Sequence, residues 1–336
     1  MSELQSFFAS DSEYSEDEAQ TSADLPRRVA DAAASGDIDT IRRWLAAGGS
    51  PDAVLRWSDG RTYGILDFTC ASSRPSNTEI VDLLLAAGVN LEGPRGGTSV
   101  EIASKYGAEA TVRRLLRAGA SVHGGGAQSE GRTSGVTPLH KAVIANNWGF
   151  YRDPWSIAQA KRATSLGHQG IVRMLLAHGA TVDGRASSSQ STPLHIAARL
   201  AGFISLGLVK ELLKNCASLD AVDFSGHVPE EVAQSRLARP IYTGNGIPED
   251  PQSLRRPGAV EAFLALLADV RAAGSFKRYA NAPRLDVVVL QALCAEGRAS
   301  PPPVLTRLFP TSTKSPHLPK EIFWRILQFW RTDRDP

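Results

Sequence analysis

Two histidines of this chain stand in nearly the same local sequence. His140 lies in GVTPLHKAV, and His195 lies in QSTPLHIAA, 55 residues further on. An imidazole can act as a general base or bind a metal ion, so a repeated histidine first suggests catalysis or metal binding. Both histidines, however, follow the same Thr-Pro-Leu triplet. A repeated phrase of this kind points to a repeated structural element that positions both side chains.

Other residue types that carry chemistry form no recognisable site. Cys70, Cys216 and Cys294 stand far apart without a CxxC pair, so we expect buried thiols and neither a disulfide framework nor a zinc site. The stretch HGGGAQSEG is rich in glycine but lacks the GK[ST] of a phosphate-binding loop. No serine or cysteine lies in a nucleophile motif, and no paired carboxylates suggest acid–base catalysis. The sequence therefore predicts no enzyme, no cofactor and no metal site.

The histidine phrases begin as helices do. A threonine side chain accepts a hydrogen bond from a free backbone N–H at the N-cap, and a proline at the first helical position loses no hydrogen bond. Thr137-Pro138 and Thr192-Pro193 are each expected to open a short helix. The stretches from Thr98 to Ser104 and from Ile65 to Ala71 keep part of this pattern.

A second phrase, in which an apolar helix ends on glycine, also recurs. It reads VRRLLRAGA from Val112 and VRMLLAHGA from Val172. Glycine adopts the left-handed conformation that ends many helices. In five places the phrase puts a residue at the end of such a helix, which we call the closing position. The five residues are Gly48, Gly88, Gly119, Gly179 and Cys216. The sequence thus predicts five helix pairs.

Together, the two phrases resemble the ankyrin repeat, whose signature TPLHxA recurs about every 33 residues. The resemblance extends from about Leu25 to Ala273. It implies an all-α fold, an ankyrin-repeat solenoid of about five to six helix-turn-helix units with insertions, followed by a C-terminal helical segment. It also implies that His140 and His195 hydrogen-bond the backbone of neighbouring units. The residues with an expected structural role in the repeat are Thr137, Pro138, Leu139, His140, Thr192, Pro193, Leu194, His195, Gly88, Gly119 and Gly179.

The spacing departs from the family at one place. Successive closing positions are 40, 31, 60 and 37 residues apart, so the interval before Gly179 holds one repeat and an insertion. The insertion includes the glycine-rich stretch and an aromatic segment, residues 147–166, which either forms a partner site or packs on itself. A last, degenerate unit is expected from the helices Ser225 to Ala233 and Gly258 to Val270.

Stacked repeats form an extended wall, because each helix pair buries its apolar face against the next. The resemblance implies that this wall and its projecting loops bind a protein partner. The loop residues expected to contact that partner are Arg132, Ser134, Arg185 and Gln190.

Charge separates the N-terminal head from the body. Residues 1–24 hold seven acidic residues and no Lys or Arg, and we expect this tail to be disordered. The body is mildly basic, but its arginines are scattered without interleaved aromatic residues, so nucleic acid is not expected as a partner. No apolar run reaches the roughly 18 residues that span a bilayer, and no signal-peptide pattern is present. We expect a cytoplasmic protein without membrane association, and a nuclear location stays open.

The C-terminal segment, residues 318–336, predicts an amphipathic helix from Leu318-Pro319 to about Trp330. At 100° per residue its apolar side chains fall within an arc of roughly 160°. The pattern LPxEIxxxILxxW resembles the first helix of an F-box, which docks a substrate receptor onto a cullin-RING ubiquitin ligase. The chain ends before the remainder of an F-box. The residues that the resemblance assigns to adaptor binding are Leu318, Pro319, Ile322, Ile326 and Leu327.

The segment between Ala273 and this helix, residues 274–317, is expected to be a linker with short helices. Within it LQALC, from Leu290 to Cys294, resembles the elongin-binding start of a SOCS box, another ubiquitin-ligase adaptor. Leu318-Pro319 would then begin its LPxP element, without the second proline. The prediction is a non-enzymatic protein-binding module that serves as a substrate receptor of a cullin-RING ligase. The alternative is a plain ankyrin scaffold or sequestering protein whose C-terminal helix only caps the array.

Overall fold

The protein is mostly helical. In a computed structural model, the residues that are described are 24–56, 62–71, 74–93, 98–123, 135–144, 166–187, 189–202, 204–238 and 258–295. Two compact parts meet between Leu264 and Ala265, and each is described by itself. No helix within these ranges is long and apolar enough to cross a membrane.

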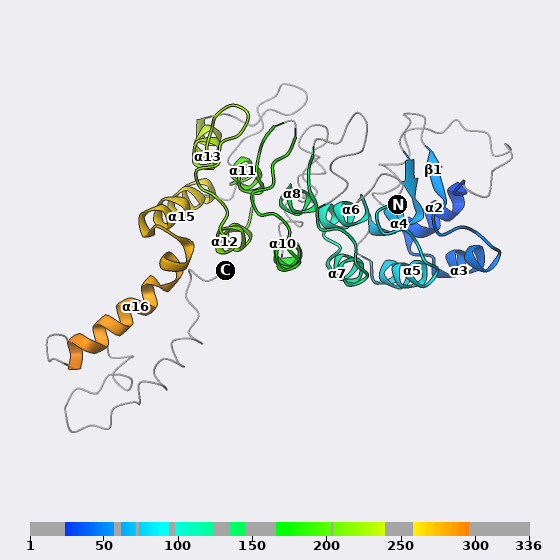
Figure 1. Ribbon diagram of the computed structural model, residues 1–336, viewed down its shortest axis with the longest axis horizontal. Coiled ribbons are helices and arrows are strands. Elements are labelled where there is room, and N and C mark those ends of the chain that lie inside the picture. The colour runs from blue at the N-terminus through cyan, green and yellow to red at the C-terminus, as the bar shows by residue number, and fades with distance from the viewer. Residues whose placement is uncertain are drawn as a thin grey trace. The chain divides into compact units, whose positions relative to one another are not determined.

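The first part is built from helices that stack in two rows (Figure 1). The first row consists of α2 (Arg27–Ser35), α4 (Ile65–Cys70), α6 (Thr98–Tyr106), α8 (Pro138–Ile144), α11 (Pro193–Arg199) and α13 (Pro229–Ala238). The second row consists of α3 (Ile38–Ala46), α5 (Pro75–Ala86), α7 (Glu109–Arg117), α10 (Leu166–Ala177) and α12 (Leu206–Lys214). From α2 to α12, each helix packs on its neighbours in the row and on a helix of the other row, and α13 packs on α11.

The two recurring phrases lie at helix ends. Helix α8 begins at Pro138 and α11 begins at Pro193, where the Thr192 side chain accepts a hydrogen bond from the backbone N–H of His195. At the closing position the backbone is left-handed in all five cases, including Cys216 with φ of 65°. A cysteine therefore occupies a conformation that glycine fills in the other four helix pairs.

Apolar side chains fill the space between the rows. Leu139 and Leu194 of the first row are fully buried, as are Leu115 and Leu175 of the second. The same positions recur along the array, so each helix pair covers the apolar face of the next one. Burial of such side chains is the main favourable term in a stacked repeat.

Buried polar side chains at the start of second-row helices add contacts between helix pairs. The Asn77 amide in α5 donates hydrogen bonds to the carbonyls of Ala33 in α2, at 2.9 Å, and of Thr69 in α4, at 3.0 Å. His168 in α10 lies 3.4 Å from the carbonyl of Lys105 in α6. Neither Asn77 nor His168 lies in one of the two repeated phrases, so the sequence analysis did not predict these contacts.

A short hairpin precedes α4 and was not expected from the sequence. Strand β1 (Val54–Arg56) pairs antiparallel with β2 (Thr62–Gly64), with Leu55 opposite Tyr63. The Asp67 carboxylate accepts a hydrogen bond of 3.0 Å from the backbone N–H of Gly64, which fixes the start of α4 against β2. Asp24, the last residue of the expected acidic tail, forms a bridge with Val54, and residues 1–23 lie outside the described ranges.

The predicted start of the last helix pair was wrong by four residues. Helix α13 begins at Pro229, whereas the sequence suggested Ser225. The residues before Pro229 form a turn with Gly226 at φ of 79°, and the backbone N–H of Ser225 donates to Asp223 at 2.9 Å. Glu231 accepts a hydrogen bond from the backbone N–H of Val228 at 2.9 Å, so the helix is capped one residue before the proline.

Helix α15 (Ala259–Ala273) corresponds to the expected helix from Gly258 to Val270, and the division between the two parts falls within it. The second part contains α16 (Phe276–Ala295), one helix of 20 residues where short helices were expected. The segment 318–336 with its adaptor-binding candidates, like the aromatic insertion up to residue 165, lies outside the described residues.

Candidate binding surface

The two repeated histidines make the same set of hydrogen bonds. The backbone N–H of Thr137 donates to Nδ1 of His140 at 3.2 Å, and the backbone N–H of Thr192 donates to Nδ1 of His195 at the same distance. The threonine hydroxyl lies 2.8 Å from Nδ1 in both cases. An amide N–H can only donate, so Nδ1 is an acceptor and the ring proton of the neutral imidazole sits on Nε2.

The Nε2 proton forms a hydrogen bond to the neighbouring helix pair. Nε2 of His140 lies 3.0 Å from the carbonyl of Ser191, and Nε2 of His195 lies 3.0 Å from the carbonyl of His227. Burial lowers the pKa of His140 to about 4 and also lowers the pKa of His195. Both rings are therefore neutral at physiological pH, and both of their nitrogens are occupied by backbone partners. Each histidine thus holds the loop that precedes the next first-row helix.

The loops held in this way lie side by side. Residues 184–187, 189–191 and 219–227 will be called the loop surface. The backbone N–H of Phe224 donates to the carbonyl of Ser189 at 2.9 Å. Arg185 donates through Nη1 to the carbonyls of Val222, at 2.6 Å, and Gln190, at 3.3 Å. Gln190 has a φ of 51° and closes the first loop by donating to the carbonyl of Ser187 at 3.2 Å.

A buried carboxylate fixes the second loop from within. The Asp223 side chain is 8% exposed and accepts hydrogen bonds from the backbone N–H groups of Ser225, at 2.9 Å, and His227, at 3.2 Å. Arg199 of α11 lies 3.7 Å from the same carboxylate. The loop backbone is therefore held at both ends and in its middle.

Apolar side chains project from this fixed backbone. Phe224 is 80% exposed and Val222 is 44% exposed. Large apolar side chains with such exposure are few in the described part of the chain, where Leu285 and Val289 of α16 complete the set. A rigid loop that presents an aromatic ring to solvent has the properties of a binding anchor.

The structure brings together only part of the predicted partner-binding set. Arg185 and Gln190 both belong to the loop surface, where their side chains hold the loop backbone. Arg132 and Ser134 lie outside the described residues, as do Leu318, Pro319, Ile322, Ile326 and Leu327. Sequence reasoning missed Val222 and Phe224, although an aromatic residue within the polar stretch DAVDFSGH was a usable signal.

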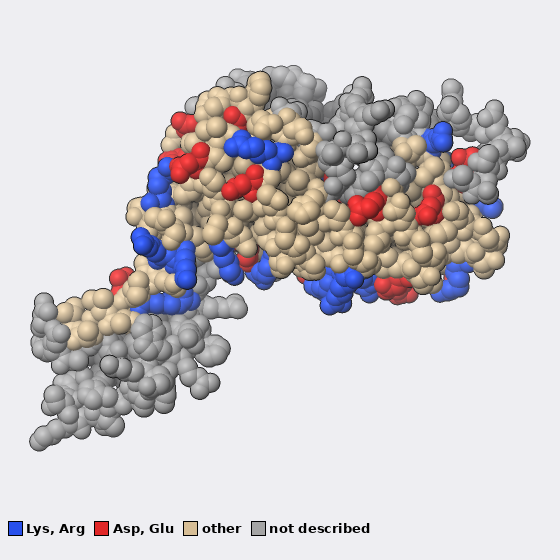
Figure 2. Space-filling view, viewed as in Figure 1, with Lys and Arg blue, Asp and Glu red and all other residues tan. Residues whose placement is uncertain are grey.

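Charged side chains gather beside the second row, with acidic groups among the basic ones (Figure 2). Arg114 of α7 pairs with Asp82 of α5 at 2.8 Å. Arg173 of α10 pairs with Glu211 of α12, whose carboxylate is buried. These ion pairs connect adjacent helices of the row, so both arginines are paired within the array.

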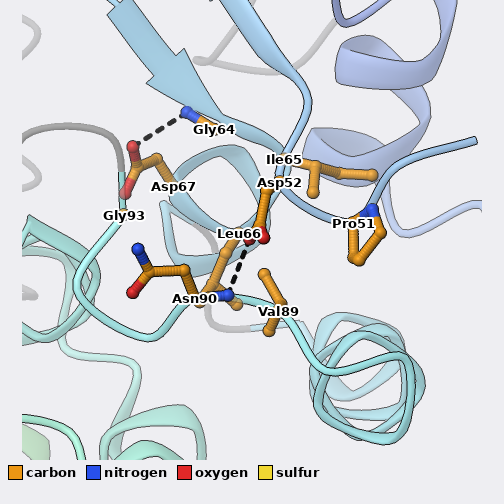
Figure 3. A pocket seen from close by; sticks show the side chains of 9 residues that line it. All are labelled: Pro51, Asp52, Gly64, Ile65, Leu66, Asp67, Val89, Asn90 and Gly93. Atoms are coloured by element: carbon orange, nitrogen blue, oxygen red, sulfur yellow. Dashed lines mark hydrogen bonds between the residues drawn. The ribbon is translucent and has the colours of Figure 1, made fainter. Parts of the chain in front are cut away.

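A pocket near the hairpin is lined by Pro51, Asp52, Gly64, Ile65, Leu66, Asp67, Val89, Asn90 and Gly93 (Figure 3). Its carboxylates are engaged by the protein itself. Asp52 accepts a hydrogen bond of 2.7 Å from the backbone N–H of Asn90, and Asp67 binds Gly64 and the Ser99 hydroxyl. The pocket thus connects the hairpin to the next helix pair and offers no free reactive group.

Catalytic or metal-binding clusters are not apparent in the described ranges. No group of three or more His, Cys, Asp or Glu side chains gathers there in a way that could hold a metal ion. Cys70 and Cys294 are buried as expected, but the expectation was wrong for Cys216, which is exposed. Its place at the left-handed helix end points the side chain to solvent.

Comparison with known families agrees with the repeated helix pairs. The family model of the ankyrin repeat matches residues 189–224. The matched segment covers α11 and α12 and ends at Phe224, so it contains much of the loop surface. The match supports an ankyrin repeat protein and, with it, a module for protein–protein interaction.

Proposed function

We propose that this chain is a non-enzymatic ankyrin-repeat solenoid of about five to six units that binds a protein partner on the loop surface. The observation that carries the proposal is the exposed Phe224, which stands on a loop held by Arg185, Asp223 and His195. An aromatic anchor of this kind binds at a low entropic cost, because the loop is already ordered before the partner arrives.

The proposal can be tested with a change that leaves the loop intact. Phe224→Ala removes the exposed ring, and the backbone contacts of the loop remain. Once affinity purification with mass spectrometry has identified a partner, this variant should bind it about 30-fold more weakly, as expected for an interface hot spot. Binding is measured by calorimetry with purified proteins.

Ser225→Ala is the matched control for that experiment. Ser225 is the next residue of the same loop and is also exposed, so its side chain tests whether any change in the loop weakens binding. The control should retain wild-type affinity. Equal affinities of wild type and Phe224→Ala for the partner would contradict the proposed surface.

We further propose that the chain acts as a substrate receptor of a cullin-RING ubiquitin ligase. The support is the F-box-like pattern of residues 318–330, with the SOCS-box-like LQALC as a second route to an adaptor. An interface of ordinary strength needs a few apolar anchors, and Ile322 and Ile326 are the central candidates. Replacing both by Asp should abolish co-purification of the F-box-binding or elongin adaptor and leave the melting temperature of the array, residues 25–238, nearly unchanged.

The alternative keeps the same surface without a ligase. In a plain scaffold or sequestering protein, the segment 318–330 would only cap the array. Wild type would then recover no adaptor, and the two Asp substitutions would lower the melting temperature by many degrees because they bury unpaired charges. A wild-type purification without cullin components would end the receptor proposal and leave the protein-binding module.

A further inference from the structure

Helix α16 exposes an apolar stripe. Leu285 is 54% exposed and Val289 is 56% exposed, and Ala292 is exposed as well. These residues follow one another at intervals of four and three, so they lie on one face of the helix. Val288 continues the same face and is partly exposed.

The other side of α16 is already covered. Phe276, Tyr279, Ala280 and Cys294 are each less than 10% exposed, and at 100° per residue they lie away from the stripe. The stretch VVVLQAL within the helix is apolar around most of its circumference. A helix of this composition is normally buried on all sides, so the stripe requires a second partner.

The chain supplies a segment that matches the stripe. Residues 318–330 carry Ile322, Ile326 and four further apolar side chains within an arc of roughly 160°, with charged residues opposite. An arc of this width suits packing against one other helix. It suits the stripe in composition, because the stripe is aliphatic and the apolar face of residues 318–330 holds branched aliphatic and aromatic side chains, with no charge on either face.

The connecting sequence is long enough for the two to meet. Between Ala295 and Leu318 lie 22 residues, which extend to roughly 70 Å at most. Helix α16, with 20 residues, is about 30 Å long. The connection PPPVLTRLFPTSTKSP is rich in proline, so it favours an extended return path over a continued helix. A segment tethered so closely meets the stripe at a far higher effective concentration than a free partner does.

We infer that residues 318–330 pack their apolar face on the Leu285–Val289 stripe of α16 within the same chain. The resulting helical hairpin covers both faces. Where it bears on the ligase, the inference rests on the proposed function: the adaptor and α16 compete for Ile322 and Ile326.

Cross-linking tests the packing itself. Cys216→Gly removes the exposed native thiol, and Val289→Cys with Ile326→Cys places one thiol on each apolar face. A short bis-maleimide should then join the two within one chain, independently of protein concentration. The matched control is Val289→Cys with Gln328→Cys, because Gln328 lies on the polar face of the same segment, and it should cross-link several-fold less. Equal yields for the two pairs would overturn the inference, and so would cross-links between chains, which would show that a second copy covers the stripe.

Hydrogen exchange provides a second measurement. Leu285→Asp with Val289→Asp changes only exposed positions, so the array should stay folded. We expect the amides of residues 318–330 to exchange about tenfold faster in this variant, with residues 25–238 unchanged. Faster exchange in the array instead would show that the stripe packs elsewhere and would overturn the inference.

Adaptor binding separates this inference from the proposed function. If both hold, purified adaptor binds the double-Asp variant of α16 more tightly than wild type. If adaptor binds neither protein and the chains still cross-link as expected, the ligase role fails and the packing stands. If adaptor binds both proteins equally, α16 does not compete with the adaptor for the segment, and the inference fails with the ligase role intact.

Discussion

At the scale of single residues, His140 and His195 show how one side chain can hold two loops. Nδ1 accepts from the helix start in the histidine's own pair, and Nε2 donates to the loop of the next pair. Both bonds need the neutral ring in one tautomer. The histidines that first suggested catalysis therefore connect neighbouring helix pairs of the array.

The neutral ring makes stability depend on pH. The pKa of His140 is lowered from 6.5 to about 4 by burial, so between these values the unfolded chain binds a proton that the folded chain does not. The free energy of unfolding therefore falls as pH decreases from about 6.5 to about 4, with at most about 3 kcal/mol from this residue. The stabilising contribution of His140 is fully present above pH 6.5.

The measurement is a series of denaturant titrations across this pH range. His140→Asn removes the titrating ring, so the variant is less stable at pH 7 but loses less stability on acidification. His178, which is exposed, provides the control, and His178→Asn should follow the wild-type curve. Parallel curves for wild type and His140→Asn would show that His140 does not titrate as described.

A substitution of Cys216 is expected to stabilise the protein, whereas the substitution of His140 destabilises it at pH 7. A non-glycine residue in the left-handed region costs roughly 1–2 kcal/mol, and the exposed Cys216 side chain returns little packing energy. Cys216→Gly should raise the free energy of unfolding by about 0.5–1 kcal/mol, after the greater flexibility of glycine in the unfolded chain is deducted. The reverse change at an equivalent position, Gly119→Ala, should be destabilising. A loss of stability in Cys216→Gly would mean that the thiol contributes contacts of its own.

At the scale of the helix pair, stability comes from the apolar layer between the rows. Leu194 is fully buried in α11, so Leu194→Ala should cost roughly 2–5 kcal/mol. Gln190→Ala in the adjoining loop should cost under about 0.5 kcal/mol, because the lost bond to Ser187 is exposed. Denaturant titrations that give equal losses for the two variants would refute the assignment of core and loop.

The local sequence predicts where the helices of a pair begin and end, but it does not predict contacts between helix pairs. Thr192-Pro193 and the left-handed closing residues mark helix ends because the signals act within a few residues. The hairpin of residues 54–64 has no such signal, since its strands are three residues long. The loop surface was missed for another reason. Arg185 meets Val222 across 37 residues, and only the stacking of two helix pairs brings them together.

At the scale of the whole molecule, the array gains stability from contacts between neighbours, so a segment outside it should contribute little. Deleting residues 1–23 should leave the melting temperature unchanged within error, because an acidic head of this composition cannot form a core. Extending the deletion through Leu25 should lower it, since Leu25 is 2% exposed and its backbone N–H donates to Val54. Thermal melts of the two truncations check this, and a lower value for the shorter deletion would assign the head a place in the fold.

The histidine bonds also bear on how the chain is made. The acceptor of His140 is Ser191, 51 residues further along the chain, and at 5–20 residues per second the ribosome delivers it about 3–10 s later. During that interval the ring of His140 has a proton to donate and no carbonyl to receive it. For His195 the wait is shorter, because His227 follows after 32 residues. Of the two histidine contacts, the one made by the fourth helix pair is thus completed later in a nascent chain. The insertion before α10 lies between His140 and Ser191, so it lengthens the time for which the ring of a newly made chain depends on water for its hydrogen bond.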